Sequence, residues 1–183
     1  MGDQIDHKIV MDGIKRQADA ILEAQKSAKQ RDWDLYYLNM ARYISTKSKD
    51  PSTQTGAVIV RPDKSVISVG FNGFPKGMND SPELYADREK KYSRTVHCEM
   101  NALLHARQDV SGSTLYTYPF ASCDRCAVHM IQAGIKRYVF PEMPPEKAAR
   151  WKDIMELAES YMREAGCEVV RIHHSEIPPV VLE

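Results

Sequence analysis

Four residues combine the side-chain types of a catalytic metal site: His97, Glu99, Cys123 and Cys126. One imidazole and two thiolates make three ligands for a tetrahedral zinc ion. The fourth position is then open to water, which distinguishes a catalytic site from a structural one. Glu99 could take a proton from a water held there and deliver it to a bound molecule. The residue types and spacing therefore predict hydrolytic chemistry at a zinc ion.

Other roles for the cysteines have to be weighed against this prediction. A Cys-x-x-Cys pair alone is also typical of a redox pair or of half a structural zinc site. Glu99 argues against a structural site, because such a site has no use for an acid beside an open coordination position. Cys98 directly follows His97, and neighbours on a helix point about 100° apart, while Cys167 lies far along the chain. We therefore expect both of these cysteines to be non-ligands.

Strand and helix patterns alternate along the part of the chain that carries these residues. Strand patterns occur at 56–60, 65–69, 114–117, 137–140 and 168–172. Helical patterns occur at 97–108, 123–133 and 144–165. A Cys-x-x-Cys at a helix start points both thiols the same way, where the positive end of the helix favours thiolate. The alternation predicts a layered α/β domain with a partly parallel sheet.

The chain divides into three predicted parts: a helical extension at 1–31, the main domain at 32–172 and a tail at 173–183. The extension has apolar residues spaced by three to five, typical of a one-sided helix. We expect it to lie on the domain or on a neighbouring subunit; a membrane-surface helix is less favoured, because aromatic anchors and a cationic face are missing. Asp32 is expected to cap a second helix, and the tail to be an extended arm.

The overall composition is that of an ordinary globular domain. The 183 residues contain 25 basic and 25 acidic side chains, so the formal net charge is zero. Proteins that bind nucleic acid usually carry a basic surplus or stripe, so we expect no nucleic-acid partner. No apolar run approaches the roughly 20 residues that span a bilayer, and the N-terminus lacks the pattern of a secretory signal. A cytoplasmic location and no membrane partner are the expectations.

Several stretches together resemble the zinc-dependent cytidine/deoxycytidylate deaminase family, and more closely its deoxycytidylate branch. They are residues 48–60, the glycine-rich loop 70–77, and the segments 97–103, 123–127 and 131–135. The resemblance covers about 33–172. It implies a three-layer α/β/α fold with a central five-stranded mixed sheet. It also implies hydrolytic deamination of dCMP to dUMP and ammonia, which supplies dUMP for thymidylate synthesis. Alternatives are another cytosine nucleotide, such as a 5-modified dCMP or dCTP, and a nucleic-acid-editing deaminase.

The resemblance also implies roles for individual residues. His97, Cys123 and Cys126 would hold one zinc ion, and Glu99 would carry a proton from water to N3 and then to the leaving amino group. Asn72 of the glycine-rich loop would lie near the sugar and base, although an asparagine between glycines is also typical of a turn.

The remaining substrate contacts are less determined by the sequence. Tyr116 could pack on the base or in the core. The phosphate needs a cation or backbone N–H groups, and Lys49 and Arg125 are the predicted contacts, with Lys76 and Arg94 as further candidates.

Three positions depart from the family pattern. Cys98 replaces the usual Ala between the histidine and the glutamate, and Ser122 replaces the usual Pro before the first zinc cysteine. Met78 stands where some regulated members have a cysteine for a second zinc, so we expect one zinc per chain. The glycine-rich loop leaves regulation by dCTP and dTTP, with Mg²⁺ on the effector, as an open expectation. The family's habit of assembling predicts a homo-oligomer, a hexamer or a dimer.

Overall fold

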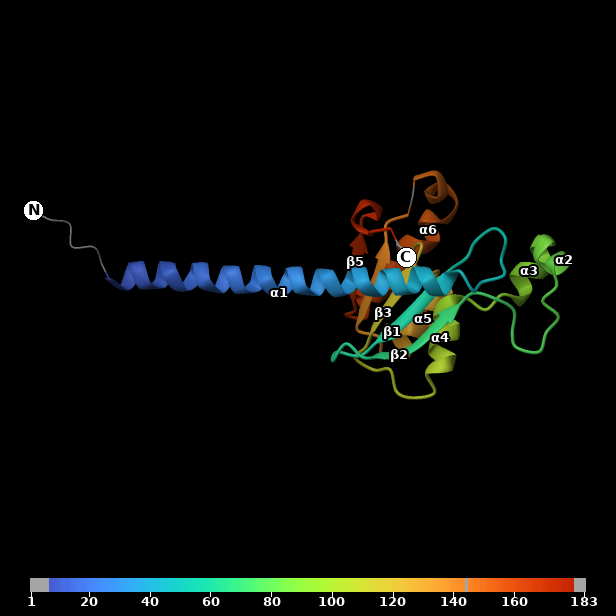
Figure 1. The fold of residues 1–183 in the computed structure, drawn as a ribbon, viewed down its shortest axis with the longest axis horizontal. Coiled ribbons are helices and arrows are strands. Elements are labelled where there is room, and N and C mark those ends of the chain that lie inside the picture. The colour runs from blue at the N-terminus through green and yellow to red at the C-terminus, as the bar shows by residue number, and fades with distance from the viewer. Residues whose placement is uncertain (1–6, 144, 180–183) are drawn as a thin grey trace, which may run out of the picture. The chain divides into compact units, whose positions relative to one another are not determined.

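The computed structural model describes the backbone of residues 7–143 and 145–179 (Figure 1). The chain forms two compact units, which divide between Asp34 and Leu35. The helix α1 (His7–Ser45) contains this division. In the part of the chain that the structure describes, no helix is long and apolar enough to cross a membrane.

The helix break expected at Asp32 is absent. Residues 7–45 form one helix, and no proline or glycine stands between Gly13 and the end of α1 to interrupt it. Gln30 Nε2 donates to Asp34 Oδ1 at 2.9 Å, an i,i+4 contact of the kind that supports a continuing helix. Asp32 therefore lies within a helix rather than at its start.

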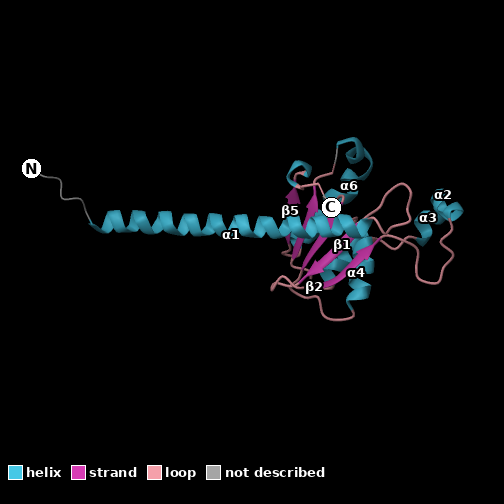
Figure 2. Cartoon of the chain, viewed as in Figure 1, coloured by secondary structure: helices cyan, strands magenta, loops and turns pink. Residues whose placement is uncertain are grey.

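Five strands of the described chain form one mixed sheet in the order β2-β1-β3-β4-β5. The strands are drawn in magenta in Figure 2. Their bounds are β1 (Gly56–Val60), β2 (Val66–Phe71), β3 (Thr114–Tyr118), β4 (Arg137–Pro141) and β5 (Glu168–Ile172). The pairs β1–β2 and β1–β3 are antiparallel, whereas β3–β4 and β4–β5 are parallel. The predicted mixed five-stranded α/β fold is confirmed.

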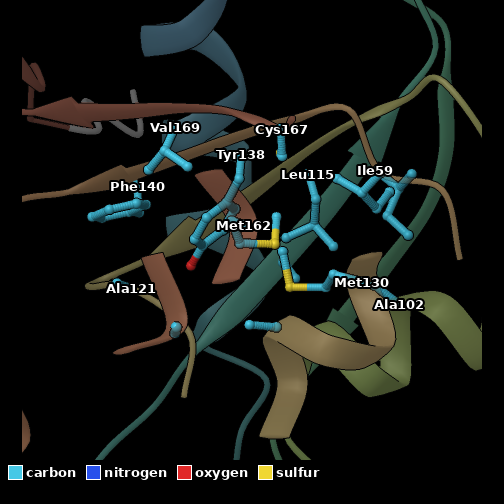
Figure 3. Close-up of a cluster of buried hydrophobic side chains, with 14 of the residues drawn as sticks. Ile59, Ala102, Leu115, Ala121, Met130, Tyr138, Phe140, Met162, Cys167 and Val169 are labelled. Carbon is cyan, nitrogen blue, oxygen red and sulfur yellow. The ribbon is translucent and has the colours of Figure 1, made fainter. Parts of the chain in front are cut away.

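Helices cover both faces of this sheet. Alternate strand residues point to opposite faces. On one face Leu115 and Tyr138 join the cluster that includes Ala102, Met130 and Met162, drawn in Figure 3. These last three residues come from α4 (Cys98–Ala106), α5 (Asp124–Gln132) and α6 (Pro145–Glu164). The other face packs on the last turns of α1, where the ring of Tyr37 lies 5.1 Å from that of Tyr116.

The segment before the first predicted ligand forms two short helices, α2 (Pro82–Ala86) and α3 (Arg88–Arg94). The tail is not simply an extended arm, because a 3₁₀ turn at His174–Glu176 precedes the buried side chain of Ile177. The first six residues of the predicted extension and the last four of the predicted tail lie outside the described residues.

Candidate zinc and catalytic site

The three predicted zinc ligands lie at the N-terminal ends of two helices. His97 is the N-cap residue of α4 and Cys123 is that of α5, with Cys126 in the first turn of α5. The position of α4 depends on Gly70 in β2, because a Cβ atom there would lie 2.4 Å from the backbone oxygen of Cys98. Only a glycine lets the strand approach the helix this closely.

The ligand atoms converge with the dimensions of a zinc site. His97 Nδ1 lies 3.4 Å from the sulfur of Cys123 and 3.4 Å from that of Cys126. All three ligand atoms lie within 4.8 Å of one another. Tetrahedral zinc with ordinary Zn–N and Zn–S bonds separates these atoms by about 3.6 Å. The residues therefore fit a zinc ion. Among the described residues this is the one such group of histidine, cysteine and acidic side chains.

The three side chains share protons with one another, which makes one of the two cysteines a thiolate. A hydrogen bond from Cys126 is the main cause that lowers the pKa of Cys123 to about 4, and His97 contributes to the same shift. The hydrogen bond with Cys123 in turn raises the pKa of His97 to about 9. The hydrogen bond with Cys123 likewise raises the pKa of Cys126 above its ordinary value. A thiolate is the form of cysteine that binds metal, so Cys123 is already in that form, whereas His97 and Cys126 would release their protons when a metal binds. Burial, in contrast, raises the pKa of Cys98 well above its usual value, so that side chain stays a neutral thiol.

Glu99 lies beside this cluster and is almost completely buried, with 4% of its surface exposed. Its Oε1 accepts a short hydrogen bond from the hydroxyl of Ser122, and the sulfur of Cys98 lies 3.3 Å from Oε2. The carboxylate and the ligands His97 and Cys123 line the same cavity, which has a volume of about 110 Å³. The acid is thus positioned to exchange protons with a molecule bound next to the three ligands.

Polar and apolar side chains both line the cavity. The polar ones, called the polar wall below, include Asp50, Thr53, Thr55, Asn72 and Lys91, and the mainly apolar ones include Tyr92, Phe120, Trp151 and Met155. An apolar pocket with a few convergent polar groups is the usual form of a small-molecule site.

Asn72 lines the cavity, as expected for a substrate contact, and also supports one of its walls. Its Oδ1 accepts from the backbone N–H of Thr55 at 2.8 Å, and its Nδ2 donates to the carbonyl of Thr53 at 2.8 Å. One lone pair and one N–H of the amide are left over. The side chain therefore holds the 53–55 segment in place and still has groups to offer to a ligand.

Three predicted substrate contacts are not among the described residues that line the cavity. Tyr116 is buried in the sheet against Tyr37, so the packing role is the one that its position supports. Lys49 is exposed and forms an ion pair with Asp80 at 2.6 Å. Arg125 is exposed as well. Their predicted contacts with substrate gain no support from the structure.

Lys91 is a cavity residue that the sequence did not indicate. It is 7% exposed, and its Nζ lies 3.0 Å from Asp50 Oδ1 and 2.5 Å from Ser52 Oγ. Its neighbour Lys90 is exposed and pairs with Asp87 at 2.8 Å. In the sequence the two lysines form one basic pair, and no local signal separates the buried side chain from the exposed one.

Comparison with known proteins places the chain among deaminases. The family described as "Cytidine and deoxycytidylate deaminase zinc-binding region" matches residues 31–142. An uncharacterized deaminase encoded in the luxG 3′ region of Aliivibrio fischeri is 39% identical over 137 residues, which cover 75% of this chain and 91% of the relative. Human deoxycytidylate deaminase is 35% identical over 127 residues, which cover 64% of this chain and 71% of the human protein.

A solved structure has the same fold. The dCMP deaminase of cyanophage S-TIM5, crystallised in complex with dCMP and dUMP, superimposes with a TM-score of 0.61 at 23% sequence identity. The superposition covers 75% of this chain and 94% of the phage protein. The likeness supports the arrangement of sheet and helices described above.

Proposed function

Because this chain belongs to the cytidine and deoxycytidylate deaminase zinc-binding family, we propose that it hydrolyses the 4-amino group of dCMP, giving dUMP and ammonia. The observation that carries the proposal is the buried carboxylate of Glu99 in a cavity shared with the ligands His97 and Cys123. Deoxycytidylate deaminases at 35–37% identity support the choice of substrate.

His97, Cys123 and Cys126 would hold the zinc ion in this reaction. Once bound, zinc would supply Lewis acidity that brings the pKa of a water toward neutrality. Glu99 would accept one proton from the attacking water and transfer it to N3 of the cytosine ring while the water oxygen bonds to C4. The same carboxylate would then move the second proton of that water to the 4-amino group, so that the C4–N bond breaks, ammonia leaves and a carbonyl remains at C4. Positioned acid–base groups of this kind contribute about 10²- to 10⁴-fold in rate.

The two kinds of side chain that line the cavity suit the two parts of a nucleoside. The aromatic rings of Phe120 and Trp151 offer apolar surface to a pyrimidine base, while Asn72 offers an amide to the base or the sugar. The cation Lys91 on the polar wall is already paired with Asp50. Because this lysine already has a partner, the cavity does not by itself distinguish a nucleoside from its phosphates, and the assay below compares them.

The experiment is an absorbance and ammonia-release assay of the purified zinc protein with dCMP, dCTP, deoxycytidine and 5-methyl-dCMP. We expect turnover with dCMP to exceed that with the others. Preference for another of these nucleotides would correct the substrate, and greater activity on cytosine-containing oligonucleotides would favour a nucleic-acid-editing deaminase. Absence of ammonia release from every substrate would refute the proposed function.

The matched variants are Glu99→Gln and Glu89→Gln. Glutamine keeps the size of Glu99 but cannot accept a proton, so we expect bound zinc to be retained and turnover to fall at least about 10³-fold. Glu89 is exposed on α3 and its variant should behave like the wild type. An active Glu99→Gln protein would exclude Glu99 as the acid–base group.

We further propose one zinc ion per chain, a homo-oligomer that is a hexamer or a dimer, and a cytoplasmic location. Metal analysis that finds two zinc ions per chain would reject the first, and light scattering that finds a monomer at micromolar concentration would reject the second. Activation by dCTP and inhibition by dTTP, with Mg²⁺ on the effector, are tested by adding these nucleotides to the same assay.

A further inference from the structure

Two side chains beside the predicted zinc ligands, those of Ser122 and Cys98, contact the same carboxylate. The hydroxyl of Ser122 donates to Glu99 Oε1, and the sulfur of Cys98 lies 3.3 Å from Oε2. All three side chains are buried. A proline at 122 would have neither a hydroxyl nor an N–H to donate. Ser122 therefore uses its hydroxyl on Glu99 and its N–H on Tyr138, two hydrogen bonds that a proline could not make.

The backbone of Ser122 is held by a chain of hydrogen bonds through Tyr138 and Thr117. This chain does not use the hydroxyl proton of Ser122, which can therefore be donated to Glu99. The backbone N–H of Ser122 donates to the hydroxyl of Tyr138 at 2.5 Å, and that hydroxyl lies 2.8 Å from Thr117 Oγ1. Thr117 Oγ1 donates its own proton to the carbonyl of Phe120 at 3.0 Å. Since the proton of Thr117 is used there, the Tyr138 hydroxyl must donate to Thr117 and accept from Ser122.

The other acceptor within reach of the Ser122 hydroxyl is weaker. The sulfur of Met130 lies 3.4 Å from Ser122 Oγ, and a thioether is a poor acceptor compared with a carboxylate. The proton is therefore directed to Glu99. On the opposite oxygen, the Cys98 thiol is only a weak donor. The Ser122 hydroxyl is thus the stronger of these two contacts on the Glu99 carboxylate.

We propose that Ser122, held by Tyr138, is a positioning residue that fixes the Glu99 carboxylate in the orientation needed for proton transfer. The proposal rests on the proposed function, because it assigns Glu99 the acid–base role. Loss of the hydroxyl leaves Glu99 with the thiol contact, and the carboxylate is then free to turn from its place beside the ligands. Polar groups that orient the ligands of a metal site typically contribute about 10- to 100-fold in activity, and we expect a comparable factor for a group that orients the acid–base residue beside such a site.

The test compares Ser122→Ala, Ser122→Thr and the control Ser68→Ala. The hydroxyl of Ser68 donates to the carbonyl of Ala102 at 2.5 Å, so the control also removes a serine hydrogen bond onto α4 without touching Glu99. For Ser122→Ala we expect kcat to fall about 10- to 100-fold while KM, zinc content and unfolding temperature stay near wild type. Ser122→Thr keeps a hydroxyl and should restore most of kcat, and Ser68→Ala should leave kcat unchanged.

Several results would overturn the proposal. A wild-type kcat in Ser122→Ala would do so, as would an equal fall in Ser68→Ala, which would indicate a general loosening of α4. Loss of zinc in Ser122→Ala would show that the serine holds the loop of Cys123 instead. If Ser122→Ala does not fold, Tyr138→Phe removes the hydroxyl that accepts from the Ser122 backbone N–H, and an unchanged kcat there would count against the proposal.

A measurement other than activity separates this proposal from the proposed function. A crystal structure of zinc-loaded Ser122→Ala should show the Glu99 side chain displaced from its wild-type orientation. If the wild type proves inactive on every cytosine nucleotide, the proposed function fails, while the displaced side chain would still show that Ser122 holds Glu99. An unmoved Glu99 would refute the positioning role whatever the substrate.

Discussion

The ion pair between Lys91 and Asp50 connects α3 to the loop that carries part of the polar wall of the cavity. Replacing Lys91 by Met should measure how much this ion pair contributes to the free energy of unfolding. Both side chains are less than a tenth exposed, with Nζ and Oδ1 3.0 Å apart. Removing one partner of a buried pair typically costs about 3–5 kcal/mol, because the other charge is left uncompensated.

The structure places the expected loss at the lower end of that range. In the Lys91→Met protein, Asp50 Oδ1 would still accept from the backbone N–H and hydroxyl of Ser52, each at 2.8 Å, and from the backbone N–H of Thr53 at 3.2 Å. We therefore expect a loss of about 3 kcal/mol in the free energy of unfolding. For a domain of this size that corresponds to a fall of about 6–12 °C in Tm.

The assay is thermal and urea unfolding of Lys91→Met beside Lys90→Met. Lys90 pairs with Asp87 on the surface, and an exposed pair contributes less than about 1 kcal/mol. Adding Asp50→Asn to Lys91→Met removes the uncompensated charge and should recover part of the loss. Equal losses for the two single lysine variants would refute the view that burial makes Lys91 different.

The same pair has a pH signature. Burial alone would raise the pKa of Asp50, but the hydrogen bonds from Ser52, Lys91 and Thr53 together hold it below its ordinary value. A carboxylate with a lowered pKa stabilises the fold above its ordinary pKa of about 3.9 and loses that contribution as the pH falls. Lys91→Met removes part of the cause, so its stability should fall less steeply on acidification than that of the wild type. Parallel acid profiles would contradict this.

Two further substitutions test the supports of the site. Gly70→Ala places a Cβ 2.4 Å from the backbone of α4, whereas the Cβ of Gly73→Ala meets only the Tyr85 hydroxyl at an ordinary 3.7 Å. Gly70→Ala should therefore lower Tm strongly and reduce bound zinc, and Gly73→Ala should do neither. Similar Tm values for the two variants would refute the close-approach argument. Asn72→Ala removes two 2.8 Å bonds to backbone groups and should cost about 2–3 kcal/mol in urea unfolding. A loss no larger than that of the exposed control Asn79→Ala would show that Asn72 does not support the wall.

What could be predicted from the sequence is what depends on short-range pattern. The strand 168–172 was expected within its observed bounds, and the alternation from residue 97 onward predicted the parallel half of the sheet. The convergence of the three ligand side chains followed from two helix starts flanking one strand. Each of these features follows from spacing within about 30 residues.

The sequence did not predict which side chains the fold buries and which it leaves exposed, because this depends on which face of each helix or strand is covered by another element. Tyr116 has the residue type of a base contact, but its place in β3 turns it toward α1. Lys90 and Lys91 differ by one helical position, and the partner that buries one of them lies 41 residues earlier in the chain. Likewise, a residue type that favours capping, such as Asp32, begins a helix only if the residues before it are not helical. Nothing in the sequence just before Asp32 prevents those residues from being helical, and the helix continues through this position.

The contact between Ser122 and Glu99 lies between these two cases. The residues are 23 positions apart, yet each stands within two positions of a predicted zinc ligand. Once the ligands His97 and Cys123 are brought within 4.8 Å of each other, the residues beside them must also approach. Ser122, beside Cys123, therefore has few polar groups within hydrogen-bonding distance. The carboxylate of Glu99, near His97, is the strongest acceptor among them. Ser122 and Glu99 are thus neighbours because the predicted metal site brings together two segments that the chain separates.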